Sequence, residues 1–318
     1  MRTRVQHATT APISGLDRLP FLGAARVRLE RVVLSLTDPP GRAQHINYLE
    51  PAGNPGIFGP DSVSWRVLSN PVTVFIGGVT AVLFELAEPR VRSGVWDHTD
   101  FRHDPVARMR RTGLAAMIFT YGSSRDVEAM TSRVRRMHDQ VNGTTPDGQP
   151  YQANDPELLT WVYATAAYGF MNAYLRYVNP RLNRAEHDRY YGESVHACRY
   201  YGANCTPASV AEVERYIEEM RPNLRNHEIL EEFLNLVSNV PILSAAALPA
   251  QRLLVQAAID VLPSWARELL RLEKAQPLRV AMRPLVRAMV GLASQVIRDG
   301  PPQRACLRMG LSASHLFS

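Results

Sequence analysis

Hydrophobic and polar positions alternate at helical spacing along most of this 318-residue chain. In the segment 124–141 one face is marked by residues at intervals of three and four: Val127, Thr131, Val134, His138 and Val141. Such intervals place side chains on one side of an α-helix. Ser123 or Ser124 is suited to cap its start, and Asn142-Gly143 is typical of a helix end. The pattern predicts an amphipathic helix whose apolar face carries a histidine.

A second helix is predicted directly before it. Asp104 is the expected N-cap, and Pro105 suits the first helical position, where a missing N–H costs nothing. Arg108, Arg111 and Thr112 follow at intervals of three and one, so they cluster on one side of this helix. Cations at a helix N-terminus oppose the macrodipole, so the cluster indicates an anion or polarised ligand that compensates them. A solvated basic first turn is the alternative.

The most apolar segment begins at Asn70-Pro71 and is nearly uncharged as far as Glu85. It is slightly shorter than the roughly 20 residues that a bilayer-spanning helix needs, so a central buried helix is expected. Gly77 and Gly78 interrupt it. Paired glycines allow close approach either of a flat group such as a macrocycle or of a neighbouring helix, and the sequence does not separate these alternatives.

Helical periodicity continues through the rest of the chain. Further helices are predicted around Trp65 and over 157–178, 183–200, 209–220, 227–239, 249–261, 264–274 and 280–299. No stretch alternates convincingly as a strand does, and no internal repeat occurs. The expected fold is all-α, with one large helical domain over 51–299, an irregular N-terminal arm or lid over 1–50, and a mobile tail over 300–318. The long loop 143–155 is expected to form a rim of the active site.

Composition sets broad limits on the function. The chain is 46% hydrophobic and 21% charged, which is typical of a globular protein. Its net charge of +6 depends almost wholly on arginine, because Lys274 is the single lysine. Acidic residues are interspersed, and no basic run is combined with stacking aromatic residues, so nucleic acid is not an expected partner.

The cysteines and the N-terminus bear on the compartment. The chain contains three cysteines, Cys198, Cys205 and Cys306. Their odd number does not suit a disulfide framework and their spacing does not suit a metal site, which is consistent with a reducing compartment. The first fifteen residues contain no apolar core of signal-peptide length. Cytoplasmic localisation without stable membrane insertion is therefore expected, whereas the sequence leaves the oligomeric state undefined.

A polar cluster precedes the arginine-bearing helix. The segment 97–104 contains His98, His103 and three aspartates, and imidazole with carboxylate suits non-haem iron or zinc. The two histidines lie five residues apart, however, which does not align them on a helix, and no third separated ligand is evident. A non-haem metal enzyme built on this cluster is the alternative function. His98 is also a candidate proton donor.

Four features then occur together in one order along the chain. They are the segment GVWDHTDF, the spacing Arg108-x-x-Arg111-Thr112, the later His138, and the segment YQANDPELLTWVYAT. As a set they resemble the family that includes the latex clearing proteins (rubber oxygenases) and the MpaB oxygenases. The resemblance extends from about Ile57 to Glu193 and therefore covers much of the chain.

The resemblance implies an all-α fold around one b-type haem, which with dioxygen or peroxide oxidises hydrophobic substrates such as isoprenoids. By position, it makes His138 the proximal iron ligand and places Arg108, Arg111 and Thr112 in the haem pocket. Trp161 and Tyr163 become candidates for contact with haem or substrate. Glu193 becomes a candidate partner for a pocket arginine.

Two residues depart from the family pattern. Where rubber oxygenases carry a lysine that sits on the distal side of the iron, this chain has Arg111. A guanidinium stays protonated and cannot ligate iron, so Arg111 is expected to donate hydrogen bonds to an oxygen species or to a haem propionate. Tyr163 stands where many relatives have histidine, which leaves the substrate class open.

The expected function is that of a haem b-dependent oxygenase or oxidase acting on a hydrophobic small molecule, such as an isoprenoid or another natural product. Arg108 and Arg111 would polarise oxygen, and the Thr112 hydroxyl would relay a proton. A non-catalytic haem-binding protein is a further alternative.

Overall fold

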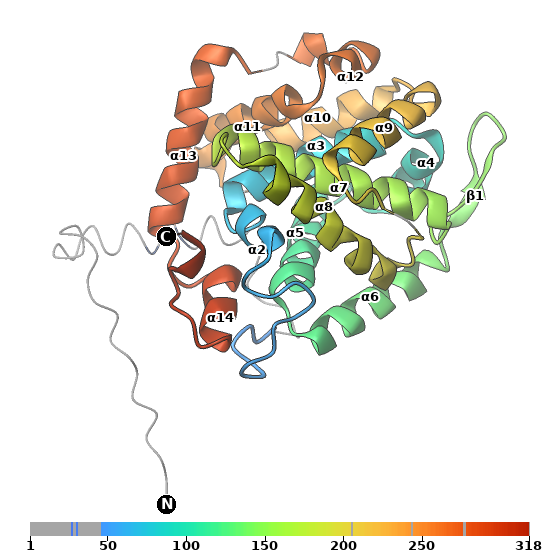
Figure 1. Ribbon diagram of the computed structural model, residues 1–318. Helices are drawn as coiled ribbons and strands as arrows, with labels where there is room; N and C mark the ends of the chain where they lie inside the picture. Colours follow the sequence, from blue (N-terminus) through green and yellow to red (C-terminus); the bar gives the residue numbers. More distant parts are fainter. Residues whose placement is uncertain are drawn as a thin grey trace, which may run out of the picture.

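The computed structural model describes Val27, Glu30 and residues 46–204, 206–242, 244–275 and 278–317. These residues form helices joined by short loops, with one small hairpin, so the all-α prediction is confirmed (Figure 1). Most of the predicted arm, residues 1–45, lies outside the described residues apart from Val27 and Glu30.

The secondary structure follows the chain in this order. The α-helices are α2 (Val63–Val67), α3 (Pro71–Glu85), α4 (Pro89–Asp97), α5 (Pro105–Tyr121), α6 (Ser124–His138), α7 (Pro156–Tyr177), α8 (Arg184–Ala197), α9 (Val210–Met220), α10 (Glu228–Asn239), α11 (Leu248–Val261), α12 (Ser264–Leu269), α13 (Arg283–Val296) and α14 (Pro301–Arg308). The 3-10 turns are η2 (Cys198–Tyr201), η3 (Arg221–Asn223), η4 (Ala245–Ala247), η5 (Leu272–Ala275), η6 (Val280–Met282) and η7 (His315–Phe317). The strands are β1 (Asn142–Thr144) and β2 (Pro150–Gln152).

Side-chain caps set the start of the helices that position the site. In each case the cap oxygen accepts a hydrogen bond from a backbone N–H two or three residues later, and the capping residues are Asn70, Asp104, Ser123, Asp155 and Asn183. These are the helix starts that the sequence predicts. Each cap satisfies one of the N–H groups that a helix leaves without an internal partner.

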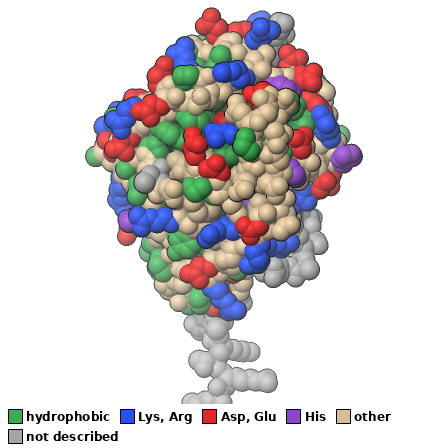
Figure 2. Space-filling model, turned by 90° about the vertical axis from the view of Figure 1, so that its right-hand side faces the viewer, with side chains coloured by type: hydrophobic (Ala, Val, Ile, Leu, Met, Phe, Trp, Pro, Cys, Tyr) green, Lys and Arg blue, Asp and Glu red, His purple; other side chains and the backbone are tan. Residues whose placement is uncertain are grey.

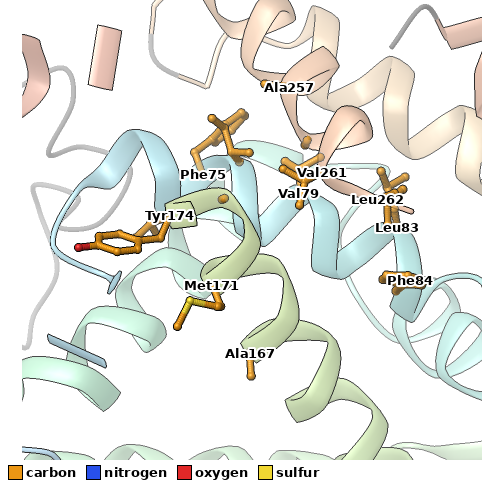
Figure 3. Packing of buried hydrophobic residues seen from close by; sticks show 14 of the residues in the cluster. Phe75, Val79, Leu83, Phe84, Ala167, Met171, Tyr174, Ala257, Val261 and Leu262 are labelled. Carbon is orange, nitrogen blue, oxygen red and sulfur yellow. The ribbon is translucent and has the colours of Figure 1, made fainter. Parts of the chain in front are cut away.

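The core is built around α3, which is buried along most of its length, as predicted. It packs against α7 on one side and α11 on another (Figure 1). Figure 3 shows Val79 of α3 next to Val261 of α11 and Leu83 next to Leu262, and Met171 of α7 belongs to the same buried cluster. A helix that is apolar all round needs partners on several sides, and α3 has them.

Two glycines allow α3 and α7 to cross closely. A Cβ atom added at Gly169 would lie 2.3 Å from the carbonyl oxygen of Gly77, and one added at Gly77 would lie 2.8 Å from the backbone of Phe170. Both distances are far below van der Waals contact. Gly77 therefore serves helix packing, and the alternative that it faces a macrocycle is wrong.

The structure contains two elements that the sequence did not predict. Helix α4 turns away from α3 by 112° after the break before Pro89. In the sequence, Pro89 indicates only the end of the preceding helix. The predicted rim loop contains the antiparallel pair β1 and β2, with Gly143 opposite Tyr151. Strands of three residues are too short for alternation to reveal them.

The C-terminal residues differ from the predicted mobile tail. Helix α14 is largely buried, and the Arg308 guanidinium donates to the carbonyl oxygens of Asn54, at 2.8 Å, and Tyr48, at 3.2 Å. Pro301 and Pro302, which suggest a break, occupy the first turn of this helix, where proline is well tolerated. The helical domain thus extends past residue 299.

The surface carries mixed charge. Figure 2 shows basic and acidic side chains interspersed over one face of the molecule, without a continuous basic area there. Among the described helices, none is by itself both long and apolar enough to cross a bilayer; only α3 with α4, and residues 280–296 with α14, meet that test, as bent pairs.

Candidate functional site

Helices α5 and α6 pack against each other next to the hairpin and α4 (Figure 1). The apolar stripe of α6 is covered unevenly: Val127 and Thr131 are buried, whereas Val134 and His138 are only partly buried and Met137 is 52% exposed. A stripe this apolar is expected to be covered along its whole length. Its C-terminal half, which carries His138, is therefore less covered than its N-terminal half.

The His138 ring lies at the end of that stripe. Its Nδ1 atom is buried and has no hydrogen bond in the described part of the chain. Burial lowers the pKa of His138, the neighbouring Asn154 side chain raises it, and nearby Arg108 lowers it. The net result favours the neutral imidazole, which is the form that a metal ion requires.

Asn154 is oriented by the end of α6. Its amide nitrogen donates to the carbonyl oxygen of Arg135, at 3.0 Å, and to Asp139 Oδ1, at 2.6 Å. Its oxygen Oδ1 is buried and makes no hydrogen bond to the described residues. Two polar atoms without partners, on Asn154 and His138, thus lie side by side at the edge of the uncovered stripe. An acceptor next to a ring nitrogen of this kind is what orients a metal-ligating histidine.

Arg108 links α5 to the other groups of the site. Its guanidinium donates to the Thr112 hydroxyl and lies 5.3 Å from the ring centre of Phe101. Burial lowers the pKa of Arg108, Glu85 raises it and Arg111 lowers it. The group nonetheless stays protonated at any accessible pH. Arg108 is therefore a fixed positive charge near enough to act on both Glu85 and His138.

Arg111 and Thr112 lie nearer to solvent on the same helix. The Arg111 guanidinium is 3.7 Å from Asp100, and both side chains are exposed, so this ion pair contributes little stability. Thr112 accepts the bond from Arg108 and donates to the Arg108 carbonyl oxygen at 3.1 Å. The predicted cluster of Arg108, Arg111 and Thr112 on one side of the helix is thus present.

Glu85 belongs to this site although the sequence pattern did not indicate a functional role for it. It is the last residue of α3, and burial raises its pKa to about 7, an effect that Arg108 opposes. No ion pair or hydrogen bond of its carboxyl group occurs within the described residues. The sequence feature that could have indicated its role is that Glu85 is the one charged residue in an otherwise apolar helix.

The pKa of Glu85 predicts a pH dependence of stability. Its folded pKa of about 7 lies above the ordinary value of 4.5, so the folded state binds more protons between these values. The stability from the buried neutral carboxyl is complete below pH 4.5 and is lost as pH rises through about 7. Glu85→Gln is expected to reduce this loss between pH 5 and 8 by about 2 kcal/mol.

Urea denaturation of the protein without added cofactor at both pH values measures this difference. Glu128→Gln is the matched control, because Glu128 is an exposed glutamate on α6. An equal pH dependence in the Glu85 variant and the original protein would contradict the assignment of a buried neutral carboxyl.

The structure separates Trp161 from Tyr163. Trp161 is fully buried, with its ring 5.9 Å from Phe84 and 6.1 Å from Tyr216, so it packs in the main core. Tyr163 instead packs with its ring 6.2 Å from Phe119, beside α6 and η2. Two residues apart on one helix, they point to different sides. Only Tyr163 lies with the residues around α5 and α6.

Glu193 and His98 have other contacts than those that the resemblance suggests. Glu193 accepts hydrogen bonds from the backbone N–H groups of Val63 and Ser64, both at 2.9 Å, and pairs with Arg189 at 3.3 Å. It thereby caps α2 rather than meeting Arg108 or Arg111. His98 Nε2 lies 3.1 Å from the Tyr151 hydroxyl, so it ties α4 to the hairpin.

The histidine and aspartate cluster at 97–104 does not assemble into a metal site. Within the described ranges, no three side chains of His, Cys, Asp or Glu are close enough to hold a metal ion together. Asp104 caps α5, and Asp100 faces Arg111. Cys198 and Cys306 are buried free thiols, while Cys205 lies outside the described residues.

Comparison with known proteins identifies the family. The family described as "ER-bound oxygenase mpaB/B'/Rubber oxygenase, catalytic domain" matches residues 65–312, which is more than half of the chain. No curated protein and no solved structure matches. The match spans the helices that carry Glu85, Arg108 and His138, and it supports an oxygenase activity. This chain therefore belongs to the mpaB and rubber oxygenase catalytic-domain family.

Proposed function

We propose that this protein is a haem b-dependent oxygenase that acts on a hydrophobic small molecule such as an isoprenoid, with His138 as the proximal iron ligand. The observation that carries the proposal is the state of His138. Its imidazole is held neutral by burial and Arg108, and it ends an apolar stripe that the protein leaves partly uncovered.

Asn154 supports the ligand role of His138. If the Asn154 oxygen accepts the proton of Nδ1, the opposite ring nitrogen, Nε2, remains available for iron. A partner on the second nitrogen fixes the tautomer and ring orientation of a metal-bound histidine. Partly buried Val134 of the stripe and exposed Met137 beside it would supply the apolar contact that a porphyrin face requires.

An apolar cluster next to α6 supports a hydrophobic substrate. Phe119 lies 5.0 Å from the Tyr201 ring and 6.2 Å from the Tyr163 ring, and the Tyr201 hydroxyl contacts the Met130 sulfur at 3.6 Å. Burial raises the pKa of Tyr163 and of Tyr201, so both phenols are neutral. Aromatic rings and a flexible thioether suit an extended hydrocarbon.

The charged residues of the site would have separate roles in the reaction. When bound, the haem would supply the redox chemistry of dioxygen activation. Arg108 holds positive charge beside His138, and Arg111, whose pair with Asp100 is weak, offers a second guanidinium to a propionate or to developing negative charge on oxygen. Glu85, whose pKa burial raises to about 7, would be the group that exchanges a proton with the substrate.

The experiment that tests the proposal is reconstitution with haem followed by spectroscopy and turnover. The loaded protein is expected to show a Soret band and to consume dioxygen with an isoprenoid such as squalene. A Soret band without dioxygen consumption for any isoprenoid would favour the non-catalytic haem carrier. Stoichiometric zinc or non-haem iron in a colourless active protein would overturn the haem assignment.

Arg108→Gln is expected to lower the turnover of the loaded enzyme by about 100-fold, because the positive charge next to His138 is lost. Arg102→Gln is the matched control. Arg102 also covers an aromatic ring, that of Trp96 at 5.3 Å, but it is exposed and pairs with Glu232. Steady-state rates and haem absorbance of both variants measure the difference, and equal rates would remove Arg108 from the proposed chemistry.

A further inference from the structure

A pocket of about 330 Å³ lies between α7, α8, α9 and the start of α12 (Figure 1). Small-molecule sites span roughly 300–1,000 Å³, so this volume suits a small ligand. The described residues that line the pocket belong to or adjoin these four helices, and none belongs to α5, α6 or the hairpin. We call it the α9 pocket, and the lining residues with a ring or a charge that concern us are Tyr168, His187, Tyr191, Glu214, Glu218 and Trp265.

Three aromatic side chains form apolar walls of the α9 pocket. Tyr168 lies on α7, Tyr191 on α8 and Trp265 on α12. Burial raises the pKa of Tyr168 to about 12 and also raises the pKa of Tyr191, so both phenols are neutral. The faces of such rings are electron-rich, and they attract cations as well as apolar groups. The walls therefore suit a ligand with an apolar body and a positive charge.

The protein already places a cation on one of these rings. The Arg221 guanidinium lies 4.7 Å from the centre of the Trp265 ring. The same guanidinium donates to Glu218 at 3.0 Å, so the charges of Arg221 and Glu218 compensate each other. The negative charge that remains at the pocket is therefore that of Glu214.

The Glu214 carboxylate lies one turn before Glu218 on α9 and is exposed to solvent. It makes no ion pair or hydrogen bond within the described part of the chain. After burial, its charge contributes to the raised pKa values of Tyr168 and Tyr191, so it is close enough to act on both rings. The pocket thus combines neutral aromatic faces with a carboxylate that has no counter-ion among these residues.

His187 adds a buried polar atom to the α9 pocket. Its Nε2 atom is buried and has no hydrogen bond in the described ranges, and its ring lies 5.4 Å from the Tyr191 ring. Burial lowers the pKa of His187, and so does Arg184, which favours the neutral imidazole. When the proton of a neutral imidazole is on Nδ1, Nε2 accepts a hydrogen bond. A buried acceptor without a partner costs free energy, and a ligand N–H removes this cost.

We propose that the α9 pocket binds a small organic ammonium ion. Its carbon body lies against the three aromatic rings, and its N–H groups donate to the Glu214 carboxylate and to His187 Nε2. A purely apolar ligand would leave both polar groups without partners, and an anion would be repelled by the carboxylate. The inference goes beyond the proposed oxygenase function and does not depend on haem binding.

Isothermal titration calorimetry of the full chain with 2-phenylethylammonium tests the proposal. The control ligand is 2-phenylethanol, which has a hydroxyl in place of the ammonium group. No haem is added, because an amine can also ligate haem iron. The ammonium is expected to bind roughly tenfold more tightly than the alcohol. Glu214→Gln and His187→Leu are each expected to weaken ammonium binding roughly fivefold, because each removes one hydrogen-bond acceptor.

Glu219→Gln is the matched control variant. Glu219 is an exposed glutamate on the same helix, but it pairs with Arg215 and does not line the pocket. This variant is expected to bind the ammonium as the original protein does, and circular dichroism checks the folding of every variant. Absence of ammonium binding, equal affinities for the ammonium and the alcohol, or an equal loss in the two glutamate variants would each overturn the proposal.

Discussion

His138→Ala is expected to remove the Soret band of the haem-loaded protein and to abolish turnover. The variant lacks the imidazole that ends the partly covered stripe of α6 beside Asn154. Haem titration followed by absorbance measures the loss, which is expected to exceed about 100-fold in affinity.

His98→Ala is the control for this experiment. His98 is exposed and contacts Tyr151 of the hairpin, so its variant is expected to keep the Soret band and haem affinity. Retention of a normal band in His138→Ala, or its loss only in His98→Ala, would contradict the assignment. Folding of the variant without haem is expected to be unchanged, because His138 is only partly buried and donates to no core group.

Gly169→Val is expected to destabilise the domain by about 3 kcal/mol or more, or to prevent folding. A Cβ atom at residue 169 would lie 2.3 Å from the Gly77 carbonyl oxygen and 3.3 Å from the Ala81 nitrogen. The obstacle is backbone, which has no rotamer to change, so α3 and α7 would have to separate at the centre of the core. Urea denaturation measures the change in the free energy of unfolding.

Gly291→Ala gives the opposite expectation on another helix. A Cβ atom there meets nothing within 4 Å, so the substitution is expected to stabilise the protein by about 0.5–1 kcal/mol through helix propensity. Equal effects of the two substitutions would show that the close crossing of α3 and α7 is not the cause.

The features that the sequence predicts are local ones. Asp104 caps α5 and Ser123 caps α6, because a cap is decided by a side chain and a backbone group two or three residues away. The stripe of α6 follows from its spacing, and the cluster of Arg108 with Thr112 lies within one helical turn. The observed helix bounds differ from the predicted ones mainly where a turn extends or ends a helix.

The features that the sequence does not predict depend on contacts between distant segments. Glu85 and Arg108 are 23 positions apart and meet only because α3 and α5 pack together, so Glu85 seemed no more than the end of an apolar helix. The positions of Trp161 and Glu193 depend on neighbours in α3 and α2. Periodicity gives the direction of a side chain relative to its own helix, not the identity of the helix opposite.

The bonds of Arg308 determine where this domain can be cut. Its guanidinium joins the C-terminal helix to carbonyl groups at Tyr48 and Asn54, so the two ends of the helical domain are fastened to each other. A fragment trimmed to begin at residue 65 would leave this cation buried without acceptors. The smallest autonomous piece therefore begins before Tyr48 and includes α14, which is longer at its start than the segment shared with the oxygenase family.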